Sequence, residues 1–259
     1  MKKIIIGLLL MSLQMHFLTA QSEFKKAFSG TGERFLEIEF QKGALMIKGY
    51  DGNEVIFKTR NQDGYDGPPA RAEGLRSMFN SAVDNTNIGL EVKESGNKMT
   101  AYKAIGADID YIIRVPRSVN VKVIEMGWQG NEITVSDMQG EVEVEGKGSD
   151  IFIREVSGPV VAHCTSGDIE VVFAKINQEL PSSISNTSGF VDVTMPESTP
   201  ADIRMSTVTG EIFTNVELDM GEERLKRVGG GKVNGSINNG GVEINLRTIS
   251  SNIYLRKKN

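Results

Sequence analysis

The chain has 259 residues, with 29 basic and 34 acidic side chains, a formal net charge of −5 and a single cysteine. The acidic balance argues against non-specific binding to nucleic acid, and one cysteine excludes both an intrachain disulfide and a multi-cysteine metal site. The length fits one large all-β domain or two small ones.

Residues 1–20 have the pattern of a signal peptide. Lys2 and Lys3 precede an apolar run over residues 4–10, and Ala20 offers a small residue for cleavage. The run is too short and too interrupted for a membrane anchor, and no later stretch is apolar enough to span a bilayer. We therefore expect an exported protein, in the periplasm or at the surface of a bacterium, with a net charge of about −7 once the two leader lysines are removed.

The mature chain opens with short runs of alternating apolar residues over 35–60 and 88–125, a period that is typical of strands. Residues 61–87 break this pattern. They begin with a loop rich in Gly, Asp and Pro, and residues 70–82 place their apolar side chains on one face of a predicted short helix. We predict a single domain over residues 21–259 that carries an insertion at 61–87, and an insertion of this length is often either a functional loop or a mobile one.

From residue 140 onward one short motif recurs. It consists of a Gly or Ser turn, one intervening residue, and then an apolar, a variable and a second apolar position. The residues after the turns are Glu141, Asp150, Pro159 and Asp168, each nine apart, followed by Phe190, Glu211 and Asn252. Asn252 lies about two units beyond Glu211. The spacing predicts a unit of about twenty residues that is built from two halves.

Strand geometry explains this motif, because successive side chains of a strand point to opposite faces. Val142 and Val144 are expected to face inward, and so are Ile169 and Val171, whereas Glu170 between them faces outward. One half cannot bury its own apolar face, so stacked copies must form a shared core. The pattern predicts an all-β, parallel β-helix (β-solenoid). A β-sandwich is the alternative, although its loop lengths vary more.

The chain ends on a strand pattern followed by Arg256, Lys257 and Lys258. A coil exposes strand edges at its ends, and charged residues discourage other chains from pairing with them. We expect these three residues to protect such an edge. A solvated basic tail fits the same residues.

Four stretches, in this order along the chain, resemble the bacterial putative adhesins with a head-type domain, long described as a domain of unknown function. The stretches are residues 43–55, residues 111–121, the Ser-Gly-Asp-Ile coils at 149–171, and residues 246–253. The resemblance implies a right-handed β-helix and an exported, envelope-associated protein. It implies no established ligand and no catalytic residues, and the insertion at 61–87 is larger than the family pattern needs.

Trp128 and Tyr65 are the candidate ligand-binding residues. Sugar-binding surfaces use exposed aromatic rings beside polar groups. Trp128 lies in a Gly-bounded segment that we interpret as a loop, and Tyr65 lies in the insertion. The alternative for Trp128 is that it caps the end of the core or packs under the long loop.

No catalytic, cofactor or metal site is predicted. His163 is the only histidine after cleavage, and we expect it on the outer surface while Cys164 points inward as a small hydrophobe. Asp150 and Asp168 are eighteen residues apart, so they could stack and share a calcium ion, but turn residues are the favoured interpretation.

The sequence thus predicts an exported, non-catalytic, envelope-associated protein that binds a surface glycan or an envelope protein. One alternative is a polysaccharide-active enzyme, because some parallel β-helices are lyases or hydrolases and carboxylates are plentiful here. The other is a protein-binding scaffold in an envelope signalling or stress system.

Overall fold

The computed structural model describes residues 23–60, 71, 75, 82–221, 226–227 and 230–258, and these contain nineteen strands and no α-helix. No helix in these ranges is therefore long and apolar enough to cross a membrane. The predicted leader, Tyr65 and most of the insertion at 61–87, including most of its predicted helix, lie outside the described residues.

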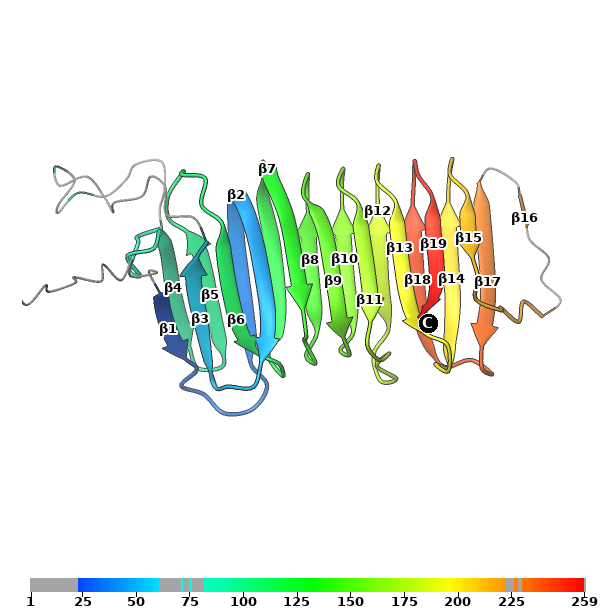
Figure 1. The fold of residues 1–259 in the computed structure, drawn as a ribbon, viewed down its shortest axis with the longest axis horizontal. Coiled ribbons are helices and arrows are strands. Elements are labelled where there is room, and N and C mark those ends of the chain that lie inside the picture. Colours follow the sequence, from blue (N-terminus) through cyan, green and yellow to red (C-terminus); the bar gives the residue numbers. More distant parts are fainter. Residues whose placement is uncertain are drawn as a thin grey trace, which may run out of the picture.

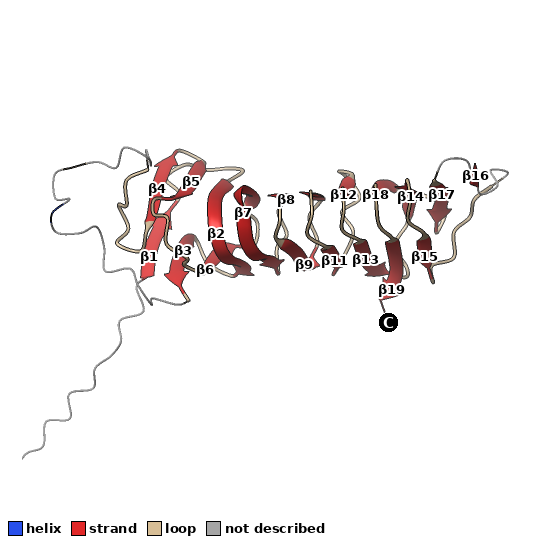
Figure 2. Ribbon diagram, turned by 90° about the horizontal axis from the view of Figure 1, so that it is seen from above, coloured by secondary structure: helices blue, strands red, loops and turns tan. Residues whose placement is uncertain are grey.

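The strands are short, apart from two that bend to serve both sides of the molecule. They are β1 (Glu23–Ala27), β2 (Phe35–Tyr50), β3 (Glu54–Thr59), β4 (Leu90–Ser95), β5 (Lys98–Lys103), β6 (Tyr111–Pro116), β7 (Asn120–Ser136), β8 (Val142–Gly146), β9 (Asp150–Val156), β10 (Val160–Cys164), β11 (Ile169–Phe173), β12 (Ser182–Asn186), β13 (Val191–Pro196), β14 (Ala201–Thr207), β15 (Ile212–Thr214), β16 (Lys226–Arg227), β17 (Gly231–Ile237), β18 (Val242–Thr248) and β19 (Ile253–Lys258). Figure 1 shows them side by side along one long axis, and Figure 2 shows two layers with the core between them.

Each layer is a row of parallel strands. The first face consists of β5, the first half of β2, the first half of β7, β8, β10, β12, β18 and β14. The second face consists of β6, the second halves of β2 and β7, β9, β11, β13, β19 and β15. The prediction of an all-β, solenoid-like fold is confirmed.

The inward and outward assignment is confirmed as well. In β11 the side chains of Ile169 and Val171 are fully buried, and that of Glu170 between them is partly exposed. In register, Val171 lies between Ile153 of β9 and Val193 of β13, and all three are fully buried. Repetition of this contact from coil to coil joins the buried side chains into one hydrophobic cluster.

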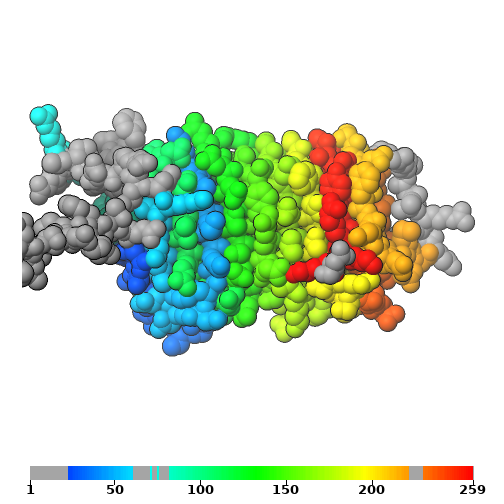
Figure 3. All heavy atoms as spheres, viewed as in Figure 1, coloured from blue at the N-terminus to red at the C-terminus, as the bar shows by residue number. Residues whose placement is uncertain are grey.

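The order of the coils in the stack differs from their order in the chain. The early strand β2 lies between the coil β5–β6 and β7, although both follow it in sequence. At the other end the last coil, β18–β19, lies between β12–β13 and β14–β15, as the red band among yellow and orange ones in Figure 3 shows. Glu211 and Asn252 therefore lie in adjacent coils, where Asn252 Oδ1 accepts the Glu211 N–H at 2.9 Å. They are not two units apart along the stack.

The C-terminal strand does not lie at an end of the stack as expected, because residues 253–255 of β19 pair with both β13 and β15. Residues 256–258 pair with β13 alone, so their protection of a strand edge stays a prediction. The Arg256 guanidinium makes a bidentate contact with Asp192 of the neighbouring β13, at 2.8 to 3.0 Å. The ends of the stack are covered by antiparallel strands. These are β4 and β3 on the two faces at one end, and β17 on the first face at the other end.

Candidate functional site

Trp128 lies in strand β7, where Gln129 pairs with Lys42 and Gly130 with Gly43 of β2, so the predicted loop is wrong. Its side chain is 62% exposed, so it neither caps the core nor packs under a loop. The flanking glycines allow neighbouring strands to pack closely. A Cβ at Gly127 would lie 2.5 Å from the carbonyl oxygen of Gln41, so glycine is needed because two bent strands stack closely there.

Three outward apolar side chains, Ile124, Met126 and Trp128, follow one another along β7, and we call them the β7 outer strip. They alternate with Val123 and Glu125, which are buried. Met126 is 47% exposed, and Ile124 is partly buried. Ile124 pairs with β2 and β8, whereas Met126 and Trp128 lie in a bulge of β7 between the residues that pair with β2. A row of exposed apolar groups of this kind is a surface available to a ligand.

Glu125 holds this part of β7 in place from within. Its Oε2 accepts the backbone N–H groups of Lys147 (2.5 Å), Gly148 (3.0 Å) and Ser149 (3.3 Å), and its Oε1 accepts the Ser149 hydroxyl at 2.8 Å. A buried carboxylate is tolerated when hydrogen bonds replace its hydration. The repeat pattern alone does not assign a role to Glu125, although a glutamate at an inward position after Val121 and Val123 is a visible exception to the alternation.

Charged side chains flank the strip on both sides. On β2, Glu37 lies opposite Lys122 and Glu39 opposite Ile124. On β8, Glu145 and Glu143 hold Lys122 at 2.7 and 2.9 Å, and these bonds raise the pKa of the lysine. The carboxylates and their lysine partner therefore form a fixed polar border along an apolar row.

Two hollows lie along the same pair of strands. One, of about 250 Å³, lies where β2 and β7 begin and is lined by Phe35, Glu37, Lys98 and Glu143 among others. The second, of about 370 Å³, lies at the bend. Its lining residues are Glu39, Gln41, Ala82, Glu91, Lys93, Tyr102, Lys103 and Met126. Ala82 belongs to the predicted insertion, so this segment reaches the same surface.

Lys103, on the wall of the second hollow, is only 5% exposed. Its Nζ donates to the carbonyl oxygens of Lys42 and Ile109. Burial lowers the pKa of Lys103 to about 8, while Asp108 and Asp110 oppose this shift. The folded protein therefore carries a buried charge below pH 8 that it loses well before the unfolded chain does.

We expect the free energy of unfolding to rise as the pH increases from 8 toward 10.5. In this window the unfolded chain, with the ordinary lysine pKa, binds more protons than the folded one. The gain should be on the order of 2 kcal/mol. Urea denaturation at pH 7.5 and pH 10 should show it in the wild type, and Lys103→Met should remove most of it. Equal pH dependence in both proteins would contradict the assignment.

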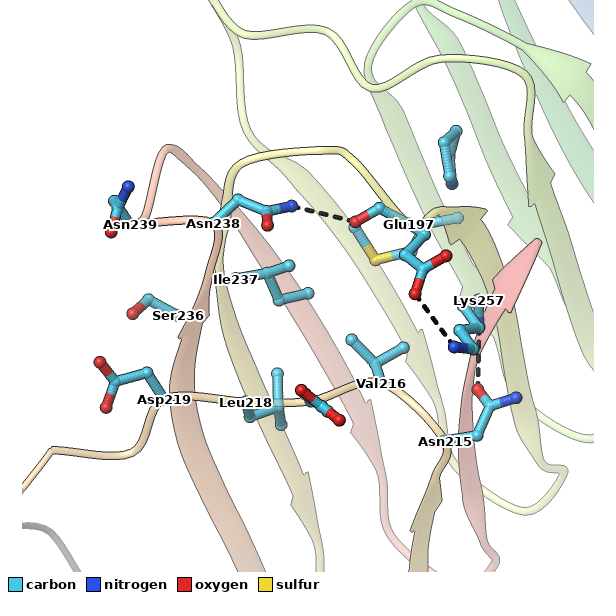
Figure 4. Close-up of a pocket in the computed structure, with 13 residues that line it drawn as sticks. Glu197, Asn215, Val216, Leu218, Asp219, Ser236, Ile237, Asn238, Asn239 and Lys257 are labelled. Carbon is cyan, nitrogen blue, oxygen red and sulfur yellow. Dashed lines mark hydrogen bonds and ion pairs between the residues drawn. The ribbon is translucent and has the colours of Figure 1, made fainter. Parts of the chain in front are cut away.

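A third cavity, of about 480 Å³, lies near the C-terminal end of the stack (Figure 4). Val216, Leu218 and Ile237 form apolar walls, and Glu197 and Lys257 pair at 3.0 Å on its rim. Neither a histidine nor a cysteine is among its thirteen lining residues. The cavity therefore offers apolar and hydrogen-bonding groups, but none of the usual pairs of nucleophile and base.

His163 is exposed on the first face, as predicted, and its Nδ1 lies 3.0 Å from the Ser185 hydroxyl. In register Glu145 lies next to His163, but its carboxylate is held by Lys122. A catalytic triad needs an acid that orients the histidine, and Glu145 makes its contact elsewhere. Cys164 is buried as predicted, and burial raises the pKa of its thiol, which makes it a poor nucleophile.

Asp150 and Asp168 act as turn residues. The Asp150 carboxylate accepts the N–H of Asp168 at 2.9 Å, and the Asp168 carboxylate accepts the N–H of Phe190 at 3.0 Å. Each aspartate thereby ties its own turn to the next coil. In the part of the chain that the structure describes, no group of three or more His, Cys, Asp or Glu side chains could hold a metal ion.

Parallel coils with covered ends and an outward apolar strip define an all-β, solenoid-like protein that presents an outer surface. Residues 80–256, more than half of the chain, match the family model described as Toastrack DUF4097. The chain therefore belongs to this family, and the resemblance to a family of unknown function is confirmed.

Two solved structures are similar to the chain. A "putative cell adhesion protein" from Clostridium sporogenes ATCC 15579 is 14% identical, with a TM-score of 0.43, and the match covers 91% of this chain and 99% of that one. A "putative adhesin" from Bacteroides fragilis NCTC 9343 is 10% identical, with a TM-score of 0.41, and the match covers 92% and 98%. Likeness at this level is too distant to bring a function to this chain. No curated protein matches it.

Proposed function

We propose that this protein is an exported, envelope-associated binding protein without catalytic activity, whose outer surface binds a glycan or an envelope protein. We also propose that its stack is a right-handed parallel β-helix with coils of about twenty residues, in keeping with register separations of 18 residues between β8 and β10 and 22 between β10 and β12. The signal-like residues 1–20 support export.

The observation that carries the binding proposal is the exposure of Trp128 in the bulge of β7. A large apolar ring that is 62% exposed forgoes burial worth about 2 kcal/mol. Large aromatic residues are over-represented among the few side chains that dominate binding energy. Residues 126–128 form a bulge between the paired residues Glu125 and Gln129 of β7. The hydrogen bonds of Glu125 to residues 147–149 fix one end of this bulge, which lowers the entropy that is lost when a ligand binds.

Trp128→Ala should weaken retention of the purified mature protein on isolated envelopes by about tenfold or more. Phe213→Ala is the matched control, because Phe213 is 46% exposed but lies on β15, on the other face. Co-sedimentation with envelope preparations, quantified over a range of protein concentrations, measures both variants against the wild type. Equal losses in the two variants would contradict a site at Trp128.

Localisation provides the second part of the test. Protease treatment of intact cells and fractionation should place the protein outside the cytoplasm. The purified protein should not turn over envelope polysaccharides. If it did, and if His163→Ala abolished the turnover, the non-catalytic assignment would be contradicted and the polysaccharide-active alternative favoured. The contact between His163 and Ser185 would then be part of a catalytic site.

A further inference from the structure

The β7 outer strip and the two hollows beside it form one continuous surface along the β2–β7 pair. Phe35, 42% exposed, lines the hollow at one end, and Met126 of the strip lines the hollow at the other. The seven residues of β2 from 35 to 41 span about 20 Å of extended strand. The surface is therefore long enough for several units of an extended chain and too shallow to enclose a single small molecule.

The chemistry of this surface is apolar along its middle and rich in hydrogen-bond acceptors along both borders. Ile124, Met126 and Trp128 form the middle. Two of the lysines at the borders are already bound to carboxylates. Lys98 contacts Glu37 at 3.2 Å, and Lys122 contacts Glu143 and Glu145. These carboxylates are therefore held in place and keep lone pairs that can accept hydroxyl donors. Hydrogen bonds to charged acceptors are among the stronger ones.

The net charge of this surface favours a neutral polymer over an anionic one as its ligand. Its acidic residues outnumber its basic ones, and the whole protein is acidic as well. The acidic residues are Glu37, Glu39, Glu91, Glu141, Glu143 and Glu145, and the basic ones are Lys93, Lys98, Lys103, Lys122 and Lys147. An anionic polymer would meet like charges, which disfavour association. A neutral sugar chain meets none, and it presents apolar ring faces to the indole and hydroxyl donors to the carboxylates.

Preorganisation strengthens this fit. Gly130 lies against Glu125 and Ser149, so close that a Cβ there would be 2.0 Å from Glu125 Oε1 and from Ser149 Oγ. Lys147 Nζ donates to the Met126 carbonyl at 2.7 Å, which ties the strip to the next coil. A surface that is already ordered costs little entropy when a ligand binds.

We infer that the β7 outer strip, with its acidic borders, is a binding site for a neutral polysaccharide chain that lies along β2 and β7. The inference rests on the proposed function and adds to it the ligand class and the residues. A protein partner at this surface is the competing outcome.

The test uses isothermal titration calorimetry of the mature protein with cellohexaose, maltohexaose, chitohexaose and hexagalacturonate. It also uses envelope glycans separated by anion exchange into a neutral and an acidic fraction. We expect saturable binding of a neutral sample and none of hexagalacturonate or the acidic fraction. Trp128→Ala should weaken that binding by about tenfold or more. Glu39→Gln should weaken it less, and Phe213→Ala should leave it unchanged. Because Trp128 is the only tryptophan, its fluorescence emission should shift with the same saturation curve.

Three results would overturn the inference. One is that no neutral sample binds at millimolar concentration. A second is that the acidic samples bind as tightly as the neutral ones. In the third, Trp128-dependent retention on envelopes survives removal of the glycans but is abolished when protease strips the envelope proteins. That third result would leave the proposed binding function in place with a protein as partner. Loss of all Trp128 dependence in the envelope assay would instead remove the proposed function itself.

Discussion

Val171→Asp should abolish cooperative folding, whereas Glu170→Lys, one position away, should leave it nearly intact. Val171 is fully buried in β11, where Ile153 and Val193 lie beside it in the neighbouring coils. An aspartate there would place an uncompensated charge, or an unpaired neutral carboxyl, in an apolar core. The loss should be about 4 kcal/mol or more, a large part of the stability of a typical domain.

Glu170 gives the matched control because its side chain points outward. It contacts Arg154 at 3.2 Å, with 36% of its side chain exposed, and Asp192 lies next to it in register. Exchange for lysine should cost less than about 1 kcal/mol, since exposed ion pairs contribute little. Circular dichroism during thermal and urea unfolding measures both variants. Similar melting of the two proteins would show that the inward and outward positions are wrongly assigned.

The features that sequence predicted correctly are those that repeat. Val142 and Val144 of β8 follow the same rule as Ile169 and Val171 of β11, because every coil must bury the same two positions against its neighbours. A rule that is repeated in each unit leaves a periodic pattern in one sequence. The fold class and the side on which His163 and Cys164 lie follow from that pattern alone.

The features that sequence missed occur once each. Gly127 and Gly130 were interpreted as the bounds of a loop, since glycine in a single sequence has the same appearance in a turn and at a close contact between strands. The role of Glu125 depends on three backbone N–H groups of residues 147–149, a contact across coils that spacing does not reveal. The place of Trp128 depends on both, so the sequence leaves open whether the ring is exposed or packed and favours a loop where the structure has a strand.

The order of the coils was hidden for a related reason. Inward positions of β18–β19 have the same apolar character as those of any other coil, so the pattern cannot say which coils they lie between. Nothing in the spacing from Glu211 to Asn252 distinguishes two sequential units from a return of the chain into the stack. Only the pairing of β18 with both β12 and β14 settles it.

Truncation after residue 240 should therefore disrupt far more than the end of the molecule. In a sequential solenoid the last coil has one neighbour, so its loss costs one interface. Here β18 pairs with β12 and β14, and β19 pairs with β13 and β15, so removal breaks two interfaces and separates β14–β15 from the rest of the stack. The lost inward side chains are Ile244, Leu246, Ile253 and Leu255, all fully buried.

At about 1.5 to 3 kcal/mol for each of these side chains, their loss approaches the entire stability of a typical domain. We expect the truncated protein to lose hydrogen-exchange protection in β14, β15 and β17, while β8 to β11 keep more of theirs. Deletion of Lys258 and Asn259 alone is the control, because Lys258 contributes an exposed ion pair with Glu155 and only the last residue pair between β13 and β19. If truncation after residue 240 left protection in β14 unchanged, β14–β15 would have to pack directly on β12–β13. The interleaved order would then be wrong.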